Sequence, residues 1–115
     1  MRYELEVQTF DVGWLYDNGY VEGAMPSKES MTKLAEETME CYSAWEDMRA
    51  AWNNEGTTRE EWDHLERRLL SELADVIQAT ANIALTCGAE QGDMATALWE
   101  CYERNVRRGR MGGGA

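Results

Sequence analysis

The chain has 115 residues, of which 43% are hydrophobic, and it contains a single proline. This length fits one domain, and the scarcity of proline permits long helices. The formal net charge of −11 argues against a surface that binds nucleic acid, and no apolar run is long enough for a membrane helix. The three cysteines show no CxxC spacing, which argues against a disulfide framework or a zinc site and favours a reducing, cytoplasmic setting.

The first 18 residues allow two interpretations. Apolar and polar residues alternate over positions 3–7, as is typical of a strand, and Asn18-Gly19 would then close a hairpin. A helical i, i+3, i+7 spacing is instead followed by Val7, Phe10 and Trp14. In that case Asn18-Gly19 ends a helix. We favour the helix, over residues 6–17, followed by a loop.

Two long helices are predicted in the middle of the chain. The first begins after Ser27 as N-cap and continues to about Trp52. The second begins with the capping box Thr58-Arg59-Glu60-Glu61 and ends near Cys87, with Gly88 at the C′ position. Winding at about 100° per residue gives each helix a broad apolar stripe. The stripes contain Met31, Leu34, Thr38, Cys41, Tyr42, Trp45, Met48 and Trp52 on the first helix, and Leu65, Leu69, Leu73, Val76, Thr80 and Ile83 on the second.

A last amphipathic helix is predicted from Gly92-Asp93 onward. The arginines near its C-terminal end interact favourably with the helix dipole. The glycine-rich residues 111–115 are expected to be disordered. The sequence therefore predicts a single all-α domain over residues 1–110, built from four helices that run antiparallel where their loops are short.

Two acidic pairs border the apolar stripes of the long helices. Glu37 and Glu40 are three residues apart, as are Glu72 and Asp75, so each pair lies on one face of its helix. One such pair usually reflects only a solvated surface. If the helices pack side by side, however, four carboxylates face one gap and repel one another unless a cation lies between them. Hard oxygen ligands suit Mg²⁺ or Mn²⁺, so a metal site is predicted here, with Asn82 beside Asp75.

The histidine and the tryptophans give weaker indications of function than the acidic pairs. His64, the single histidine, lies among acidic residues at a helix start and is expected at the surface. The tryptophans Trp45, Trp52, Trp62 and Trp99 follow helical spacings and are most simply core or subunit-interface anchors. The sequence shows no Ser/His/Asp or Cys/His nucleophile arrangement and no GxxxxGK[ST] phosphate loop.

The acidic pairs belong to a longer pattern. It consists of Lys33, Glu36, Glu37 and Glu40, followed by Glu72 and Asp75, with Asn82 seven residues later. This KxxEExxE…ExxD pattern resembles that of the MazG-like all-α nucleoside triphosphate pyrophosphohydrolases. The run Asn105-Val106-Arg107-Arg108-Gly109 is similar to the NxxRG ending of that family, and Trp14 to Gly19 resembles a helix end that precedes its acidic helix.

The likeness covers about Val7 to Gly109 and has two departures. The interval between the acidic motifs is longer than in compact members, which a longer helical hairpin would absorb. Some relatives carry a lysine one turn before NxxRG, where this chain has Cys101. That departure bears on the residues expected to contact substrate phosphates, and not on the expected metal ligands.

The resemblance implies a four-helix bundle that hydrolyses a nucleoside triphosphate to the monophosphate and pyrophosphate. The implied ligands of Mg²⁺, or of Mn²⁺ in its place, are Glu37, Glu40, Glu72 and Asp75. Either Glu37 or Glu40 would accept the proton of the attacking water. The candidates for substrate contacts are Lys33, Asn82, Arg104 and Arg108. The family also implies a homodimer or a homotetramer built as a dimer of dimers, with sites near subunit interfaces.

Two other functions fit the same sequence. The acidic charge is compatible with a non-catalytic helical protein that binds a basic partner, for which binding would weaken with salt. A helical bundle that binds a divalent metal for other chemistry would release no pyrophosphate from any nucleotide. Within the enzyme interpretation, the residues do not indicate the base or the sugar of the substrate.

Overall fold

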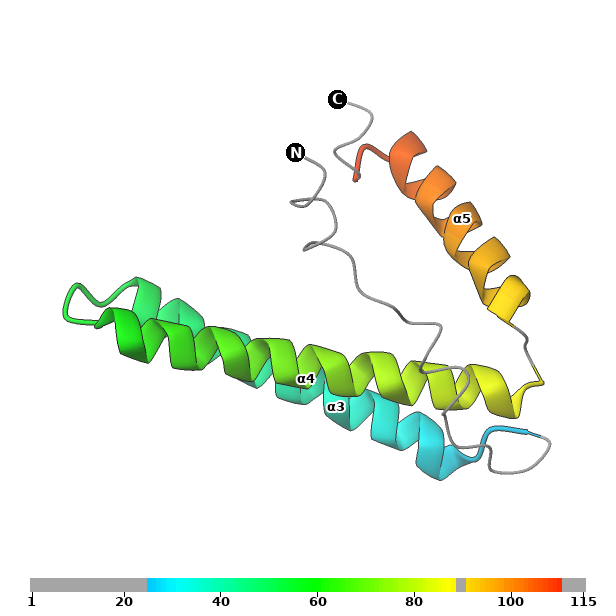
Figure 1. Ribbon diagram of the computed structural model, residues 1–115, viewed down its shortest axis with the longest axis horizontal. Coiled ribbons are helices and arrows are strands. Elements are labelled where there is room, and N and C mark those ends of the chain that lie inside the picture. The colour runs from blue at the N-terminus through cyan, green and yellow to red at the C-terminus, as the bar shows by residue number, and fades with distance from the viewer. Residues whose placement is uncertain (1–24, 89–90, 111–115) are drawn as a thin grey trace.

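The computed structural model describes residues 25–88 and 91–110, which form three α-helices and no strand within those ranges (Figure 1). The helices are α3 (Lys28–Trp52), α4 (Arg59–Thr86) and α5 (Gln91–Arg107). The prediction of an all-α chain is confirmed for this part. The helix expected over residues 6–17 and the tail at 111–115 lie outside the described residues.

Both long helices begin at the predicted side-chain caps. The Ser27 hydroxyl accepts a hydrogen bond from the Ser30 N–H at 3.0 Å, and the Thr58 hydroxyl accepts one from the Glu61 N–H at 3.1 Å. Each bond satisfies an N–H group that has no partner within its helix. At the other end of α4, Gly88 has a φ of 80°, the left-handed conformation that glycine adopts without strain.

Helices α3 and α4 pack side by side as an antiparallel hairpin (Figure 1). The turn between them is held by the Thr57 hydroxyl, which donates to the Ala51 carbonyl at 2.8 Å. In the part of the hairpin nearer the turn, an ion pair between Arg68 and Asp47 links the two helices. The short turn and this cross-link fix the register in which the two acidic motifs face each other.

The contact between the helices is a narrow seam with heptad spacing. Its members recur at intervals of three and four residues: Leu34, Glu37, Cys41, Ala44, Met48 and Ala51 on α3, and Trp62, Leu65, Leu69, Glu72, Val76, Ala79, Ile83 and Thr86 on α4. This spacing is typical of helices that cross at a shallow angle. Among the described residues, only Ala44 and Ala81 are fully buried apolar side chains. The described part of the chain therefore buries few large apolar side chains.

Two different faces flank the seam. The polar face, one position before the seam residues, contains Lys33, Glu36, Glu40, Ser43 and Asp47 on α3, and Arg68, Ser71, Asp75, Gln78 and Asn82 on α4. The apolar face, one position after them, contains Ala35, Tyr42, Trp45 and Trp52 on α3, and Leu70, Leu73, Ile77 and Ala84 on α4, and toward the turn it also carries the charged residues Arg49, Asp63 and Glu66. A step of one residue turns the side chain by about 100°. Both helices are right-handed but run in opposite directions, so viewed from one end of the hairpin their side chains rotate in opposite directions along the chain. Equal steps on both helices therefore point to the same side of the hairpin.

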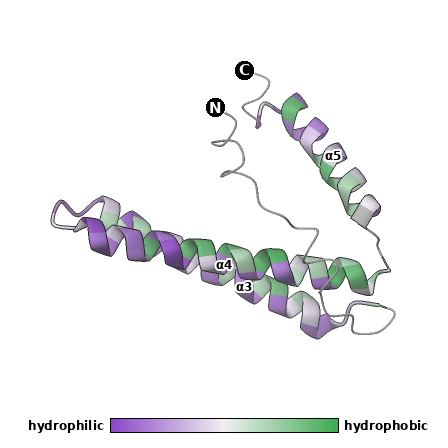
Figure 2. Ribbon diagram, viewed as in Figure 1, coloured by the Kyte–Doolittle hydropathy of each residue, from purple (hydrophilic) through white to green (hydrophobic). Residues whose placement is uncertain are grey.

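The hydropathy of the hairpin also changes along its length. Figure 2 shows hydrophilic residues near the turn of α4 and hydrophobic residues toward the end that leads to α5. Helix α5 lies apart from the hairpin (Figure 1), and the extensive helix packing among the described residues is that of α3 against α4. The described part of one chain thus does not form the four-helix bundle that was expected. None of the described helices has the length and apolar character needed to cross a membrane.

Candidate metal site

Three carboxylates meet on the hairpin. Glu37 and Glu40 come from α3 and Glu72 from α4, and one carboxylate oxygen of each lies within 4.8 Å of the other two. The spacing of three residues places Glu37 and Glu40 one turn apart, and the seam places Glu72 opposite them. Carboxylate oxygens grouped in this way match the ligands of a hard divalent cation. The structure therefore brings together three of the four predicted metal ligands.

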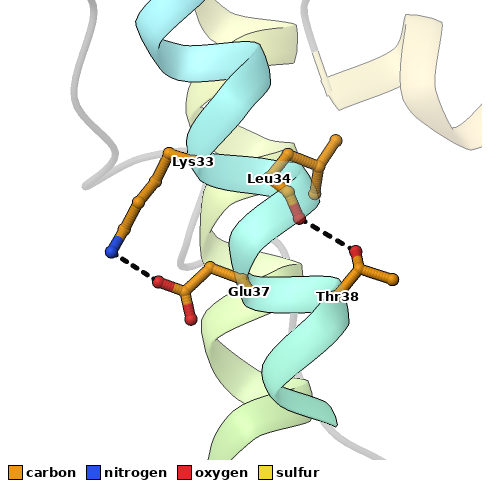
Figure 3. Close-up of polar contacts among 4 residues, drawn as sticks. All are labelled: Lys33, Leu34, Glu37 and Thr38. Carbon is orange, nitrogen blue, oxygen red and sulfur yellow. Dashed lines mark hydrogen bonds and ion pairs between the residues drawn. The ribbon is translucent and has the colours of Figure 1, made fainter. Parts of the chain in front are cut away.

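Glu37 is the most enclosed member of this group. It exposes only 5% of its surface, and its Oε1 lies 2.6 Å from the Lys33 Nζ (Figure 3). The other carboxylate oxygen, Oε2, is buried without a hydrogen-bond partner, as is Oε2 of Glu72. A buried carboxylate oxygen without a partner lowers stability. A cation held between the carboxylates would supply the missing partner, so the residues present fit a metal ion.

The neighbours of Glu37 on α3 do not compete for its free oxygen. Figure 3 shows the Thr38 hydroxyl on another side of the helix, where it donates to the Leu34 carbonyl at 2.9 Å. Lys33 is bound to the opposite oxygen, and its side chain remains largely exposed. The ion pair of Glu37 with Lys33 therefore leaves its other carboxylate oxygen, Oε2, without a hydrogen-bond partner.

The cluster alters the protonation of its members. A hydrogen bond with Glu72 is the main cause that raises the pKa of Glu40, followed by the negative charge of Glu37. The hydrogen bond and charge of Glu37 raise the pKa of Lys33, which keeps the lysine positively charged. Burial, followed by the charges of the surrounding carboxylates, raises the pKa of the Cys41 thiol. Cys41, which is half-buried in the seam, is thus a neutral thiol.

Asp75 lies beside the three carboxylates rather than among them. It lines an open pocket of about 200 Å³ on the polar face, together with Lys33, Glu37, Gln78 and Asn82. The Gln78 amide donates to the Asn82 side-chain oxygen at 3.0 Å, which fixes the orientation of both amides. Two of the predicted substrate contacts, Lys33 and Asn82, therefore lie next to the carboxylates.

The other two predicted substrate contacts lie elsewhere. Arg104 and Arg108 are exposed near the end of α5, and no contact within the described ranges connects them to the hairpin pocket. Conversely, the sequence prediction missed Gln78. Its position four residues before Asn82, on the same helical face as Asp75, was the signal that identifies it.

Comparisons of the chain with protein-family models, with curated proteins and with solved structures find no match. The likeness to MazG-like enzymes consequently rests on the residue pattern of the two acidic motifs and their flanks. The site itself is defined by the burial and convergence of Glu37, Glu40 and Glu72.

Proposed function

We propose that this chain is a Mg²⁺-dependent nucleoside triphosphate pyrophosphohydrolase, which converts an NTP or dNTP and water to the monophosphate and pyrophosphate. The observation that supports this most is the buried Glu37 carboxylate, which has one unpartnered oxygen and which groups with the carboxylates of Glu40 and Glu72. Three carboxylates and the adjacent Asp75 exceed the charge of the one lysine in the pocket, so a divalent cation balances them. The MazG-like pattern supplies the reaction type.

In this proposal Glu37, Glu40 and Glu72 hold the metal, and Asp75 completes the set from the edge of the pocket. When bound, Mg²⁺ polarises the phosphate and lowers the pKa of a coordinated water. Of the two candidate bases, Glu40 is better placed to accept the proton of the attacking water, because it is exposed on the polar face. One oxygen of Glu37 is already occupied by Lys33.

In this proposal the substrate phosphates are bound by polar side chains that do not hold the metal. Lys33 and Asn82 line the pocket and provide donors for phosphate oxygens. Arg104 and Arg108 contribute if α5 approaches the hairpin, either in the same chain or from another subunit. In the homodimer or dimer of dimers that we propose, two hairpins supply the four helices of the expected bundle.

Pyrophosphate release tests this function. A panel of canonical and damaged nucleoside triphosphates is incubated with the full chain in Mg²⁺, in Mn²⁺ and in EDTA, and the nucleotide product is identified. We expect release only with the metals, and the nucleoside monophosphate as the other product. Folded protein that hydrolyses no nucleotide of the panel would contradict the proposal and favour the non-catalytic acidic binding protein.

A further inference from the structure

The polar pocket beside the carboxylates contains two amide side chains whose orientations are coupled. Gln78 and Asn82 are four residues apart on α4, so they lie on one face of the helix, and both line the pocket with Lys33 and Asp75. The Gln78 Nε2 atom donates a hydrogen bond to the Asn82 Oδ1 atom at 3.0 Å. Both side chains are half-buried, so water competes less for this bond than it does at an open surface.

This bond determines which polar group Asn82 offers to a ligand. A primary amide carries an acceptor oxygen and a donor NH₂ group on its two sides, and a rotation of 180° exchanges them. Because the oxygen of Asn82 accepts from Gln78, the NH₂ group of Asn82 lies on the side away from Gln78. Toward a ligand in the pocket, Asn82 therefore acts as a hydrogen-bond donor and not as an acceptor.

The charges around the pocket make this orientation important for an anionic ligand. Glu37 and Asp75 line the pocket, and Lys33 is the one cationic side chain among the described residues that line it. Glu40 and Glu72 lie next to Glu37. An amide oxygen turned toward a phosphate would add to the repulsion from these carboxylates. An NH₂ group instead donates to the phosphate, and hydrogen bonds to a charged group are stronger than those between neutral groups.

We propose that Gln78 is a positioning residue for the substrate phosphates, because its hydrogen bond holds the Asn82 amide with the NH₂ group toward the pocket. The inference rests on the proposed function, which supplies a ligand that carries phosphate. In this role Gln78 does not contact the phosphate and acts only through Asn82. The KxxEExxE…ExxD pattern does not include Gln78, so the assignment comes from the hydrogen bond and the pocket alone.

A positioning role differs from a purely structural one in a measurable way. Amide pairs four residues apart also stabilise a helix by a small amount, which would affect phosphate binding whether or not Asn82 keeps its amide. If Gln78 acts through Asn82, removal of the Asn82 amide abolishes the effect of Gln78 on phosphate binding. A double-mutant cycle measures this coupling.

The test is the affinity of the full chain for tripolyphosphate in the presence of Mg²⁺, measured by titration calorimetry. Tripolyphosphate presents the phosphate groups of the proposed substrate without a base or a sugar. Gln78→Met preserves the length of the side chain and lets the Asn82 amide rotate, so we expect a loss of about threefold. Gln78→Glu can only accept a hydrogen bond and turns the Asn82 NH₂ group toward itself, so we expect a loss of roughly tenfold or more.

The same two substitutions are then measured together with Asn82→Ala. We expect Gln78→Met to have no further effect there, and the loss from Gln78→Glu to be roughly threefold smaller, because only its charge still opposes phosphate. The matched control is Thr80→Val, which removes a hydrogen bond to the Val76 carbonyl at an exposed position of α4 outside the pocket. This variant should bind tripolyphosphate as the parent chain does.

Helicity from circular dichroism accompanies each affinity, and if one Gln78 variant loses helicity the other decides. Losses that are equal with and without the Asn82 amide would overturn the inference, as would a parent chain that binds no tripolyphosphate in Mg²⁺. The measurement does not use turnover. A chain that shows the expected coupling but hydrolyses no nucleotide would contradict the proposed function alone, whereas hydrolysis combined with additive losses would contradict this inference alone.

Discussion

At Glu37 the chain buries a carboxylate in the seam between two helices and leaves one of its oxygens without a partner. The ion pair to Lys33 contributes little stability by itself, because the lysine side chain is largely exposed to solvent. An alanine or leucine at the same heptad position would pack the seam without this cost. The position is therefore better explained by ligand binding than by packing.

Glu40 would make the metal affinity of the proposed site depend on pH. Its hydrogen bond with Glu72 and the charge of Glu37 raise its pKa, so the metal-free folded chain retains a proton that an unfolded glutamate has lost. The associated stabilisation is complete at low pH and is lost as the pH rises through the raised pKa. A cation must displace this proton in order to bind Glu40.

We therefore expect the affinity for Mn²⁺ to rise as the pH increases through the raised pKa of Glu40, with proton release on binding below that pH. Titration calorimetry in two buffers of different ionisation enthalpy measures both quantities. In Glu40→Gln the pH dependence should largely disappear, whereas Glu46→Gln, an exposed glutamate on the same helix, should retain it. An affinity independent of pH in the parent chain would contradict this role of Glu40.

At the scale of the helices, the ends were predictable because local chemistry sets them. At the start of each long helix, the side chain of Ser27 or Thr58 accepts a hydrogen bond from a backbone N–H three residues later. At the end of α4, Gly88 adopts the left-handed backbone conformation that terminates a helix. The buried side of each helix was less predictable. The apolar arc of α3 is wider than the seam, and the packing partner decides which part of a wide arc is buried. Tyr42 and Trp45 consequently lie outside, while Glu37, expected at the margin, lies in the seam.

Thr58 provides a test at this scale. Thr58→Ala removes the acceptor for the Glu61 N–H, and we expect a loss of about 1 kcal/mol in the free energy of unfolding. For a domain of this size that corresponds to a fall in Tm of roughly 4–8 °C. Thr32→Ala, at an exposed site within α3, should have little effect. Equal melting temperatures for Thr58→Ala and the parent chain would show that this cap is not needed.

At the scale of the whole molecule, the described hairpin has two chemically different faces. The polar face holds the pocket with Asp75, Gln78 and Asn82, and the apolar face holds the exposed aromatic residues. The residue types of the site were predictable, because paired carboxylates three residues apart face one side of a helix. The positions of Arg104 and Arg108 relative to the pocket were not predictable, because they depend on how α5 packs and not on the sequence of α5.

The most direct measurement of the central claim is metal-dependent pyrophosphate release by the parent chain, by Glu37→Gln and by Glu46→Gln. Glu37→Gln preserves the shape of the buried side chain but removes one negative ligand, whereas Glu46 lies on α3 outside the carboxylate group. The account predicts hydrolysis in Mg²⁺ by the parent chain and by Glu46→Gln, and a loss of at least a hundredfold in Glu37→Gln. Hydrolysis by Glu37→Gln at the rate of the parent chain would contradict the assignment of the site.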